Sequence, residues 1–482
     1  MSQKTIAFAP HNQQHLKVFK KIGKHLRTQQ GYKIIFVKEL GNIKGESVFE
    51  FDRVISERWK RLDISYANLS RLEKRYSQSD LTRALFCERN NNYYPKYFRQ
   101  AKVAYETQLK YLVGCFEVFD EWLTANPVDC IVSELLIGVS DSVLYAVCQS
   151  KNIQYLSIRS SKLLPGVITC SPEIDQPSGM LDVYKEFIDN GVPDHYAKMA
   201  KMHIEELRSS ISTPDYMQVS KTNFKLMTRQ RFLNFISASV KNKVPTNDIS
   251  LCKHPLWESI LRIIHRFVNI QITKKYSSIW FCHQLSHGER YFIFPLQYEP
   301  EATTLIRAYP FSDQMAVIQQ IAKALPLGTT LVVKEHRGNH GYRKPSFYRD
   351  LHYLPNVRLV PREAVLDGLI KNSIGIITLN SRMGWEGLVL RKPVIALGKG
   401  FWTFFNKVKN PASWAELRNM IRNIISGDGR DHQLEYDDYL IAYAAAYISL
   451  TKKGNFVLAS DDFLTPANID KLSDIIARGL VR

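Results

Sequence analysis

The chain has 482 residues, more than the roughly 250 to 300 at which a single hydrophobic core usually divides into domains. Hydrophobic residues make up 45% and charged residues 23%, ordinary globular values that argue against a largely disordered chain. The formal net charge of +19 favours anionic partners, for which a membrane leaflet, an acidic polysaccharide and nucleic acid are the candidates.

Cysteine usage and the N-terminus indicate where the protein works. Seven cysteines stand singly, mostly within apolar runs and without a Cys-x-x-Cys pair, which is typical of reduced thiols in a cytosol. The apolar run at 5–9 is too short for a signal peptide, and no window reaches the ~18 to 20 apolar residues of a membrane span. We expect a cytoplasmic protein, soluble or peripheral on the inner face of the plasma membrane.

Residues 1–170 are predicted to form a first α/β domain, on the acceptor side of the molecule. A strand at 5–9 leads into a polar loop with His11, then a helix with apolar residues near a 3.6 period and a strand at 32–37. A later strand ends on Glu134 and is followed by another helix and strand. Because an open parallel sheet presents its ligands at the carboxyl ends of its strands, we expect His11 and Glu134 at that edge.

Residues 171–285 are predicted to be a mainly helical, basic connecting segment. Between Lys221 and Arg290 there are twelve Lys or Arg residues against three acidic ones, a local net charge of +9. This segment could meet an anionic membrane surface, or it could be a solvated basic face. The helix after Pro255 has an apolar face that could pack on a domain or touch lipid. We expect no nucleic-acid partner, because no aromatic RNA-binding signature or zinc-finger spacing is present.

Residues 286–426 are predicted to form a second α/β domain, followed by a helical segment at 427–482. Strands are expected at 291–296, 329–333, 356–360, 374–379 and 394–397, and helices at 314–325, 364–371 and 384–390. Such alternation favours a parallel, doubly wound sheet.

Three polar clusters in this domain directly follow short apolar runs, where an α/β sheet ends in ligand-binding loops. A leaving nucleotide phosphate needs Lys, Arg, His or backbone N–H groups to neutralise its charge, and the clusters supply those types. The predicted donor-binding residues are Gln297, Glu299, Lys334, His336, Arg337, Asn380, Ser381, Arg382, Gly384 and Glu386. The pattern predicts a nucleotide-sugar site.

Individual roles within these clusters leave alternatives. Ser381 is expected to cap a helix whose N-terminus faces phosphate, and Glu386 to accept hydrogen bonds from ribose hydroxyls. Alternatively, Glu386 pairs with Arg382 four residues earlier on the helix. Lys334 and Glu335 could instead form a surface ion pair, with His336 a satisfied loop histidine.

Catalysis requires a carboxylate or imidazole near the acceptor, and three residues are candidates. Glu134 is the first, His11 the second and Glu301 the third. No Asp-x-Asp pair stands in a suitable loop, so we expect a metal-independent transfer without a cofactor.

The motifs also carry a family resemblance. The runs 294–301, 333–336, 354–357 and 380–394 resemble the bacterial capsule polysaccharide biosynthesis and export family, which includes Kdo transferases. The resemblance implies two Rossmann-like domains facing a cleft (GT-B type), with the donor nucleotide bound mainly by the C-terminal domain. The family usually has proline after the motif histidine, whereas here His336 is followed by Arg337. This departure leaves open whether the donor is a CMP-sugar or another nucleotide sugar.

The leading hypothesis is a glycosyltransferase that moves a sugar from a nucleotide-sugar donor to capsule, lipopolysaccharide or a lipid-linked glycan acceptor. A nucleotide-sugar epimerase of the same architecture is the second hypothesis. The third is a non-catalytic polysaccharide export or assembly component, for which Arg337 in place of proline is the main hint.

Overall fold

The structure is a computed structural model that describes residues 3–11, 13–37, 47–87, 104–136, 138–209, 211, 256–299, 301–339, 341–427, 433–457 and 460–480. These residues form two compact units. The first takes in the described residues up to Ser178, residues 256–258 and those from Leu450 onwards. The second takes in 179–211 and the described residues of 259–449.

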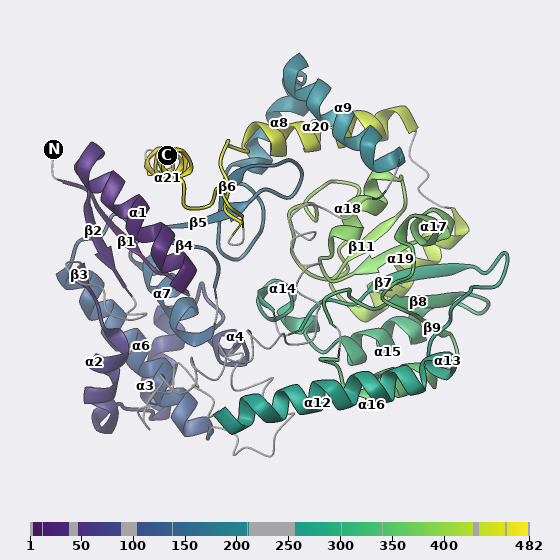
Figure 1. Ribbon diagram of the computed structural model, residues 1–482, viewed down its shortest axis with the longest axis horizontal. Helices are drawn as coiled ribbons and strands as arrows, with labels where there is room; N and C mark the ends of the chain where they lie inside the picture. The colour runs from purple at the N-terminus through teal and green to yellow at the C-terminus, as the bar shows by residue number, and fades with distance from the viewer. Residues whose placement is uncertain are drawn as a thin grey trace. The chain divides into compact units, whose positions relative to one another are not determined.

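The first unit is built on a six-stranded sheet in the order β3-β2-β1-β4-β5-β6 (Figure 1). Its strands are β1 (Thr5–Phe8), β2 (Lys33–Phe36), β3 (Ser47–Val48), β4 (Cys130–Ser133), β5 (Gln154–Ser160) and β6 (Val167–Cys170). Neighbours are parallel except for β5 and β6. The chain adds strands on one side of β1 and then crosses to β4 on the other, so the order reverses between β1 and β4.

Helices cover both faces of this sheet. They are α1 (Gln13–Gln30), α2 (Phe51–Arg58), α3 (Tyr66–Arg75), α4 (Leu81–Phe86), α6 (Tyr105–Ala125), α7 (Gly138–Ser150) and α21 (Pro466–Gly479), with a 3-10 turn at Trp59–Arg61. One buried cluster joins α1 and α21 to the strands, and a second joins α2, α6 and α7 to them. The apolar face expected on the first helix is confirmed, since Leu16, Phe19, Ile22 and Leu26 are buried.

The second unit has a five-stranded, fully parallel sheet in the order β11-β10-β7-β8-β9. Its strands are β7 (Tyr291–Pro295), β8 (Thr330–Lys334), β9 (Val357–Val360), β10 (Gly375–Thr378) and β11 (Val394–Ala396), each within a residue or two of the predicted range. The strand order reverses between β7 and β10. Both units are therefore Rossmann-like, as the sequence predicts.

Helices of the second unit form layers on its sheet and a separate group beside it. They are α8 (Met180–Asn190), α9 (Asp194–Ser209), α12 (Leu256–Lys275), α13 (Ser277–Trp280), α14 (Ala302–Leu305), α15 (Gln314–Ala324), α16 (Pro345–His352), α17 (Leu366–Asn372), α18 (Arg382–Val389), α19 (Trp414–Ser426) and α20 (Gln433–Ser449), with a 3-10 turn at Tyr309–Phe311. The predicted connecting segment is mainly helical where it is described, and its residues 210 and 212–255 lie outside the described ranges. Among the described residues, no helix is long and apolar enough to cross a membrane.

The group beside the sheet, formed by α8, α9 and α20, is held in part by one carboxylate. Asp437 of α20 accepts hydrogen bonds from Arg208 of α9, at 2.7 Å, and from Arg391 in the turn after α18. Burial acts to raise the pKa of Asp437, but these two arginines outweigh it and lower the pKa to about 2. The carboxylate is therefore ionised at neutral pH.

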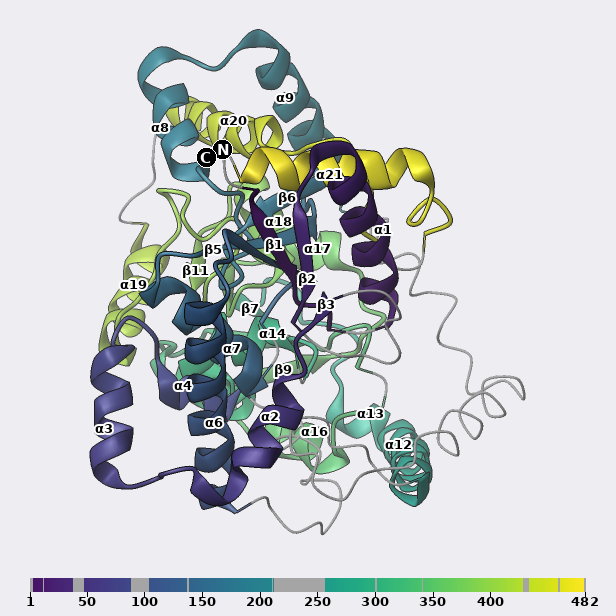
Figure 2. The same ribbon diagram turned by 90° about the vertical axis from the view of Figure 1, so that its left-hand side faces the viewer.

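The last helix returns to the first unit, where α21 lies beside α1 on the same face of the sheet (Figures 1 and 2). Leu472 of α21 is fully buried in the cluster that includes Phe19 of α1 and Phe456. The C-terminal segment therefore completes a core that begins at the N-terminus.

Replacing Leu472 with Ala should destabilise the first unit by about 2 to 5 kcal/mol, because a fully buried leucine leaves a cavity in a close-packed core. Urea unfolding measures the loss. The control is Lys471→Ala, at the exposed neighbouring position. Equal stability of the two variants would show that α21 does not belong to this core.

Candidate functional site

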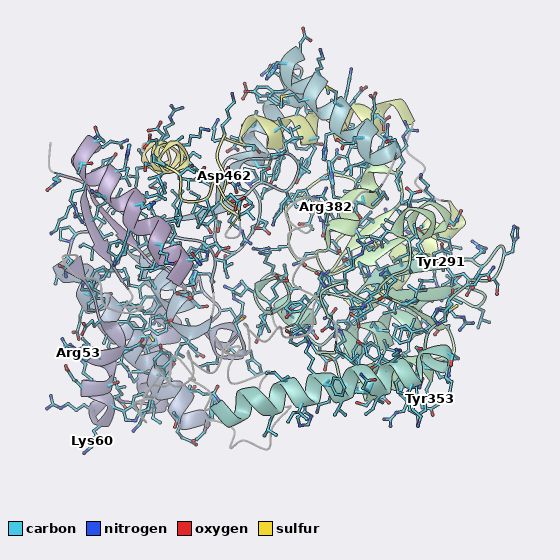
Figure 3. The ribbon with its side chains drawn as sticks, in the orientation of Figure 1. Arg53, Lys60, Tyr291, Tyr353, Arg382 and Asp462 are labelled. Atoms are coloured by element: carbon cyan, nitrogen blue, oxygen red, sulfur yellow. The ribbon has the colours of Figure 1, made fainter. Side chains whose placement is uncertain are left out.

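The switch point of the second sheet gathers the predicted donor loops. Gln297 and Glu299 follow β7, and Asn380 follows β10, the next strand in the sheet. Asn380 Nδ2 donates to the carbonyl of Thr303 at 2.8 Å and to that of Lys399 at 3.1 Å. Figure 3 labels two residues at opposite ends of the strands. Tyr291 is at the amino end of β7, and Arg382 lies beyond the carboxyl end of β10. The loops after β7 and β10 are thus joined at the carboxyl edge.

A buried arginine joins the loops after β7 and β8. The Arg343 guanidinium donates to Glu299 Oε2 at 2.8 Å and to the Gln297 carbonyl at 2.5 Å, and its Nε lies 3.4 Å from Glu335 Oε2. Its side chain is 6% exposed, so these contacts take place away from water. Sequence reasoning missed Arg343, which stands far along the loop after β8, just before α16.

Lys334 and Glu335 do not form a surface ion pair, because both side chains are buried. Lys334 Nζ donates to the carbonyls of Glu335, at 3.2 Å, and of Arg362 after β9, at 2.7 Å. Burial, assisted by the charge of Arg337, lowers the pKa of Lys334 from 10.5 to about 8. The lysine therefore links the ends of β8 and β9.

His336 is held as a neutral ring. Its Nδ1 accepts a hydrogen bond from the Gly338 N–H at 3.0 Å, so the ring proton of the neutral form sits on Nε2. Burial lowers the pKa of His336, although the charges of Glu301 and Glu335 oppose this. The ring thus offers an N–H donor at neutral pH, and Glu301 belongs to the electrostatic surroundings of the motif.

The helix after β10 begins as the sequence predicts. Ser381 is the N-cap of α18, and its Oγ accepts a hydrogen bond from the Met383 N–H at 3.2 Å. Arg382 Nε lies 3.4 Å from Glu386 Oε1, so the local ion pair that the spacing allows is present. Burial raises the pKa of Glu386, while the charges of Arg382 and Arg337 work in the opposite direction. Contact between Glu386 and a ribose stays a prediction.

Gly384 has a packing role in α18. A Cβ atom at this position would lie 2.2 Å from the indole ring of Trp402, a distance that real Cβ contacts do not show. Only glycine lets the buried Trp402 ring pack against the first turns of the helix. Its predicted contact with the donor stays a prediction.

A pocket of about 330 Å³ lies beside these loops, at the ends of β8 and β9 and against α12. Its lining residues are Ile270, Thr273, Lys274, Ser277, Phe281, His283, Glu335, Asn339, Gly341, Tyr348, Pro361, Arg362 and Glu363. Asn339 is 2% exposed, and its Nδ2 points to Glu335 Oε1 at 3.5 Å. This orientation leaves Asn339 Oδ1 as a buried acceptor with no hydrogen-bond partner among the described residues.

The pocket contains residues that sequence reasoning missed. Arg362 and Glu363 directly follow β9, the same position after a strand by which the other polar clusters were recognised. That signal was available in the sequence. Asn339 had no such signal, since its place in the pocket depends on the fold of the loop after β8.

The first unit also gathers polar side chains at its switch point, between β1 and β4. His11 Nε2 lies 2.8 Å from Ser133 Oγ, and His11 Nδ1 lies 3.4 Å from Asp141 Oδ2. The Leu135 N–H also points to Nε2, at 3.5 Å. Both ring nitrogens of His11 thus contact protein groups, which suits a residue that holds the loop in place.

Glu134 presents a carboxylate at the same edge. Its Oε2 lies 2.8 Å from Nε2 of the buried His15, and its side chain is 23% exposed. Burial acts to raise the pKa of the Glu134 carboxyl, but the hydrogen bond from His15 and the charges of His15 and Arg159 outweigh it. The pKa is therefore lowered, and an ionised, partly accessible carboxylate results. Sequence reasoning placed Glu134 and His11 here but missed His15 and Asp141.

The comparison with known families identifies the segment that carries the donor motifs. Residues 260–406 match the family described as capsule polysaccharide biosynthesis protein. Within this segment the chain is similar to that family. The match covers every predicted donor-binding residue, so the resemblance inferred from the motifs is confirmed for the capsule biosynthesis segment.

Solved structures with a similar chain trace include transferases and epimerases. The beta Kdo 2,7 transferase of KpsC from Thermosulfurimonas dismutans is 9% identical, with a TM-score of 0.32, and the match covers 75% of this chain and 89% of that chain. The beta Kdo 2,4 transferase of the same KpsC is 14% identical, with a TM-score of 0.30, over 74% and 88%. UDP-GlcNAc 2-epimerase from Neisseria meningitidis is 11% identical, with a TM-score of 0.27, over 99% and 100%. No curated protein matches the chain.

The buried side chain of Lys334 should make the free energy of unfolding depend on pH. Between pH 8 and 10.5 the unfolded chain binds more protons at Lys334 than the folded chain does, so stability should rise with pH there. Relative to Lys334→Met, the wild type should gain roughly 3 kcal/mol across this range. Urea unfolding at pH 7 and pH 10 measures the difference.

The control for this experiment is Lys323→Met, which removes an exposed lysine from the same unit. Its stability relative to the wild type should change little between the two pH values. If the difference in unfolding free energy between the wild type and Lys334→Met is the same at pH 7 and pH 10, Lys334 is not buried as described.

Proposed function

We propose that the chain is a glycosyltransferase that transfers a sugar from a nucleotide-sugar donor to a bacterial surface polysaccharide or glycolipid, as in capsule or lipopolysaccharide biosynthesis. The observation that carries this proposal is the gathering of the capsule biosynthesis motifs at the switch point of the second sheet, tied together by Arg343 and Asn380. Ligands of open α/β sheets bind at this point.

The donor nucleotide is proposed to lie across the loops after β8, β9 and β10. The phosphates meet Arg337, Arg382 and the Nε2–H of His336, which supply the positive charge and the donor that a departing phosphate needs. These groups meet the charge requirement without a metal ion. Gln297, Glu299 and Lys334 act indirectly, because their contacts hold the loops in register.

The nucleoside is proposed to occupy the pocket beside β8 and β9. Its volume of about 330 Å³ is at the lower end of the range for small-molecule sites. Glu363 lines this pocket and suits ribose hydroxyls, a role for which Glu386, beside Arg382, is the other candidate. The acceptors Asn339 Oδ1 and Glu335 Oε2 favour a base with an exocyclic amino group, such as cytosine, since uracil and thymine offer a single N–H.

Glu134 is proposed as the catalytic carboxylate. Glycosyl transfer breaks the bond between the anomeric carbon and the phosphate oxygen, forms a bond from that carbon to an acceptor hydroxyl oxygen, and releases the hydroxyl proton. An ionised carboxylate can take this proton, or it can stabilise the positive charge that develops on the sugar. Glu134 is ionised and partly accessible, whereas His11 has both nitrogens engaged and Glu301 lies beside the donor motif.

The acceptor is proposed to be a glycan or lipid-linked glycan at the cytoplasmic face of the membrane. The net charge of +19 supports this placement, because both the leaflet and many surface glycans are anionic.

A thermal-shift panel with CMP, UDP, GDP, dTDP and their sugar conjugates tests the donor site, because a ligand that binds only the native state raises the melting temperature. We expect a shift with cytidine or guanine nucleotides that exceeds the shift with uridine or thymidine nucleotides. Asn339→Leu should weaken the preferred nucleotide about tenfold, since it removes one buried hydrogen bond of roughly 1.4 kcal/mol.

The matched control is Asn372→Leu, at an exposed position of the same unit. A preference for uridine nucleotides would refute the assignment of the base pocket. If no nucleotide shifts the melting temperature, the result favours the hypothesis of a non-catalytic export or assembly component. Turnover of the donor sugar without any acceptor would favour the epimerase.

Glu134→Gln should lower turnover at least a hundredfold while donor affinity stays within about twofold, because the amide cannot take a proton or carry charge. Nucleotide release in the presence of a glycan acceptor measures turnover, and the thermal shift measures affinity. Glu173→Gln removes a carboxylate that is paired with Arg83 in the same unit, and it should leave both quantities unchanged. Wild-type turnover in Glu134→Gln removes Glu134 from the mechanism.

A further inference from the structure

Helix α12 has one side fixed to the second unit. Asn269 Nδ2 donates to the Gly341 carbonyl at 3.1 Å, and the Arg266 guanidinium lies 4.3 Å from the centre of the Tyr342 ring. Ile270 and Thr273 on this side line the pocket beside β8 and β9. The inner side of α12 is therefore part of the proposed nucleoside site.

The outer side of α12 and α13 exposes an apolar stripe, which we call the α12 outer face. Its members are Ile264 (50% exposed), Phe267 (49%), Val268 (42%), Ile272 (37%) and Ile279 (57%). The first four belong to α12, and their spacing of three, one and four residues places them on one side of that helix, while Ile279 belongs to α13. Both ribbon views show α12 at the outside of the second unit (Figures 1 and 2). A cluster of exposed apolar side chains on one side of a helix is typical of an interaction surface.

The charges around this face limit what can cover it. Between Ser259 and Gly288 the sequence contains four Lys or Arg residues, three histidines and no acidic residue. Lys275 lies among the apolar members, and Lys274 borders them, and both side chains are exposed. A second copy of this face would meet the same positive charge and be repelled. A soluble anionic polysaccharide would pair with the lysines but leave the isoleucines and Phe267 in water.

An anionic bilayer satisfies both features. A helix with an apolar side and flanking basic residues lies in the interface, with its apolar side chains among the acyl chains and its lysines at anionic headgroups. We propose that the α12 outer face docks on the anionic lipid surface of the membrane. This inference rests on the membrane placement proposed above, but not on the identity of the donor or on Glu134.

Docking in this way gives one helix two functions. The inner side of α12 lines the nucleoside pocket, and the outer side contacts lipid, so the donor pocket is held within one helix diameter of the headgroups. A lipid-linked acceptor would then meet the donor without leaving the membrane.

Sedimentation of the full chain with vesicles of phosphatidylcholine and phosphatidylglycerol tests the proposal. The double variant Phe267→Gln and Ile272→Gln should bind these vesicles at least tenfold more weakly than the wild type, since two apolar side chains no longer insert. The matched control is Leu327→Gln with Val365→Gln, which changes two exposed apolar residues of the same unit outside this face. The control should bind as the wild type does.

A further variant tests the electrostatic contribution to vesicle binding. Lys275→Gln should weaken binding roughly fivefold at low salt, because each basic residue near an anionic surface contributes about that factor. Wild-type binding should fall steeply with salt and be weak on vesicles of phosphatidylcholine alone.

Three results would overturn the proposal: equal binding of the double variant and the wild type, equal binding of the wild type to neutral and anionic vesicles, or a change in oligomeric state with unchanged vesicle binding. The nucleotide thermal shift of the double variant, measured without vesicles, should equal that of the wild type. This measurement separates the two proposals. If neither the wild type nor the double variant shows a nucleotide thermal shift, the result contradicts the donor site and leaves the membrane proposal unaffected.

Discussion

The buried guanidinium of Arg343 is the interaction on which the second unit's candidate site depends. It contacts Glu299 and the Gln297 carbonyl after β7, and Glu335 after β8, so two loops from neighbouring strands take their positions from one side chain. Removing both carboxylates would leave a positive charge uncompensated in the interior, which is far more costly than the loss of a surface ion pair. The motif histidine and the pocket acceptor Asn339 are both in the loop that it anchors.

The two sheet edges use their charged residues in opposite ways. At the first edge, histidines are engaged by Ser133, Asp141 and Glu134, and what remains accessible is a carboxylate. At the second edge, Glu299 and Glu335 are engaged by Arg343, and Arg337 after β8 has an exposed side chain. A negative edge suits a hydroxyl that must lose a proton, whereas a positive edge suits a phosphate that must leave.

Local signals were sufficient to predict the strands of the second sheet, several helices and the Ser381 cap, because apolar runs, 3.6-residue periods and capping residues act within a few positions. Contacts between distant residues were not predictable in this way. Arg343 meets Glu299 across 44 residues, and the two are not related by any sequence period. The burial of Lys334 was not predictable either. Lys334 is the last residue of a strand that is buried on both faces, and such a strand has no alternation of polar and apolar residues to show that the side chain points inward. Glu386 could reach either a ribose or Arg382; it lies beside Arg382 in the structure, and its contact with a ribose stays a prediction.

The return of α21 to the first sheet has a consequence for how the chain folds during synthesis. The strands of the first unit and α1 emerge from the ribosome early, yet the face of the sheet that α1 covers lacks its second helix until residues 466–479 have been made. Domains usually fold in the order in which they are translated. Here the second unit can close first, and the first unit reaches its final core only after residues 466–479 have left the ribosome.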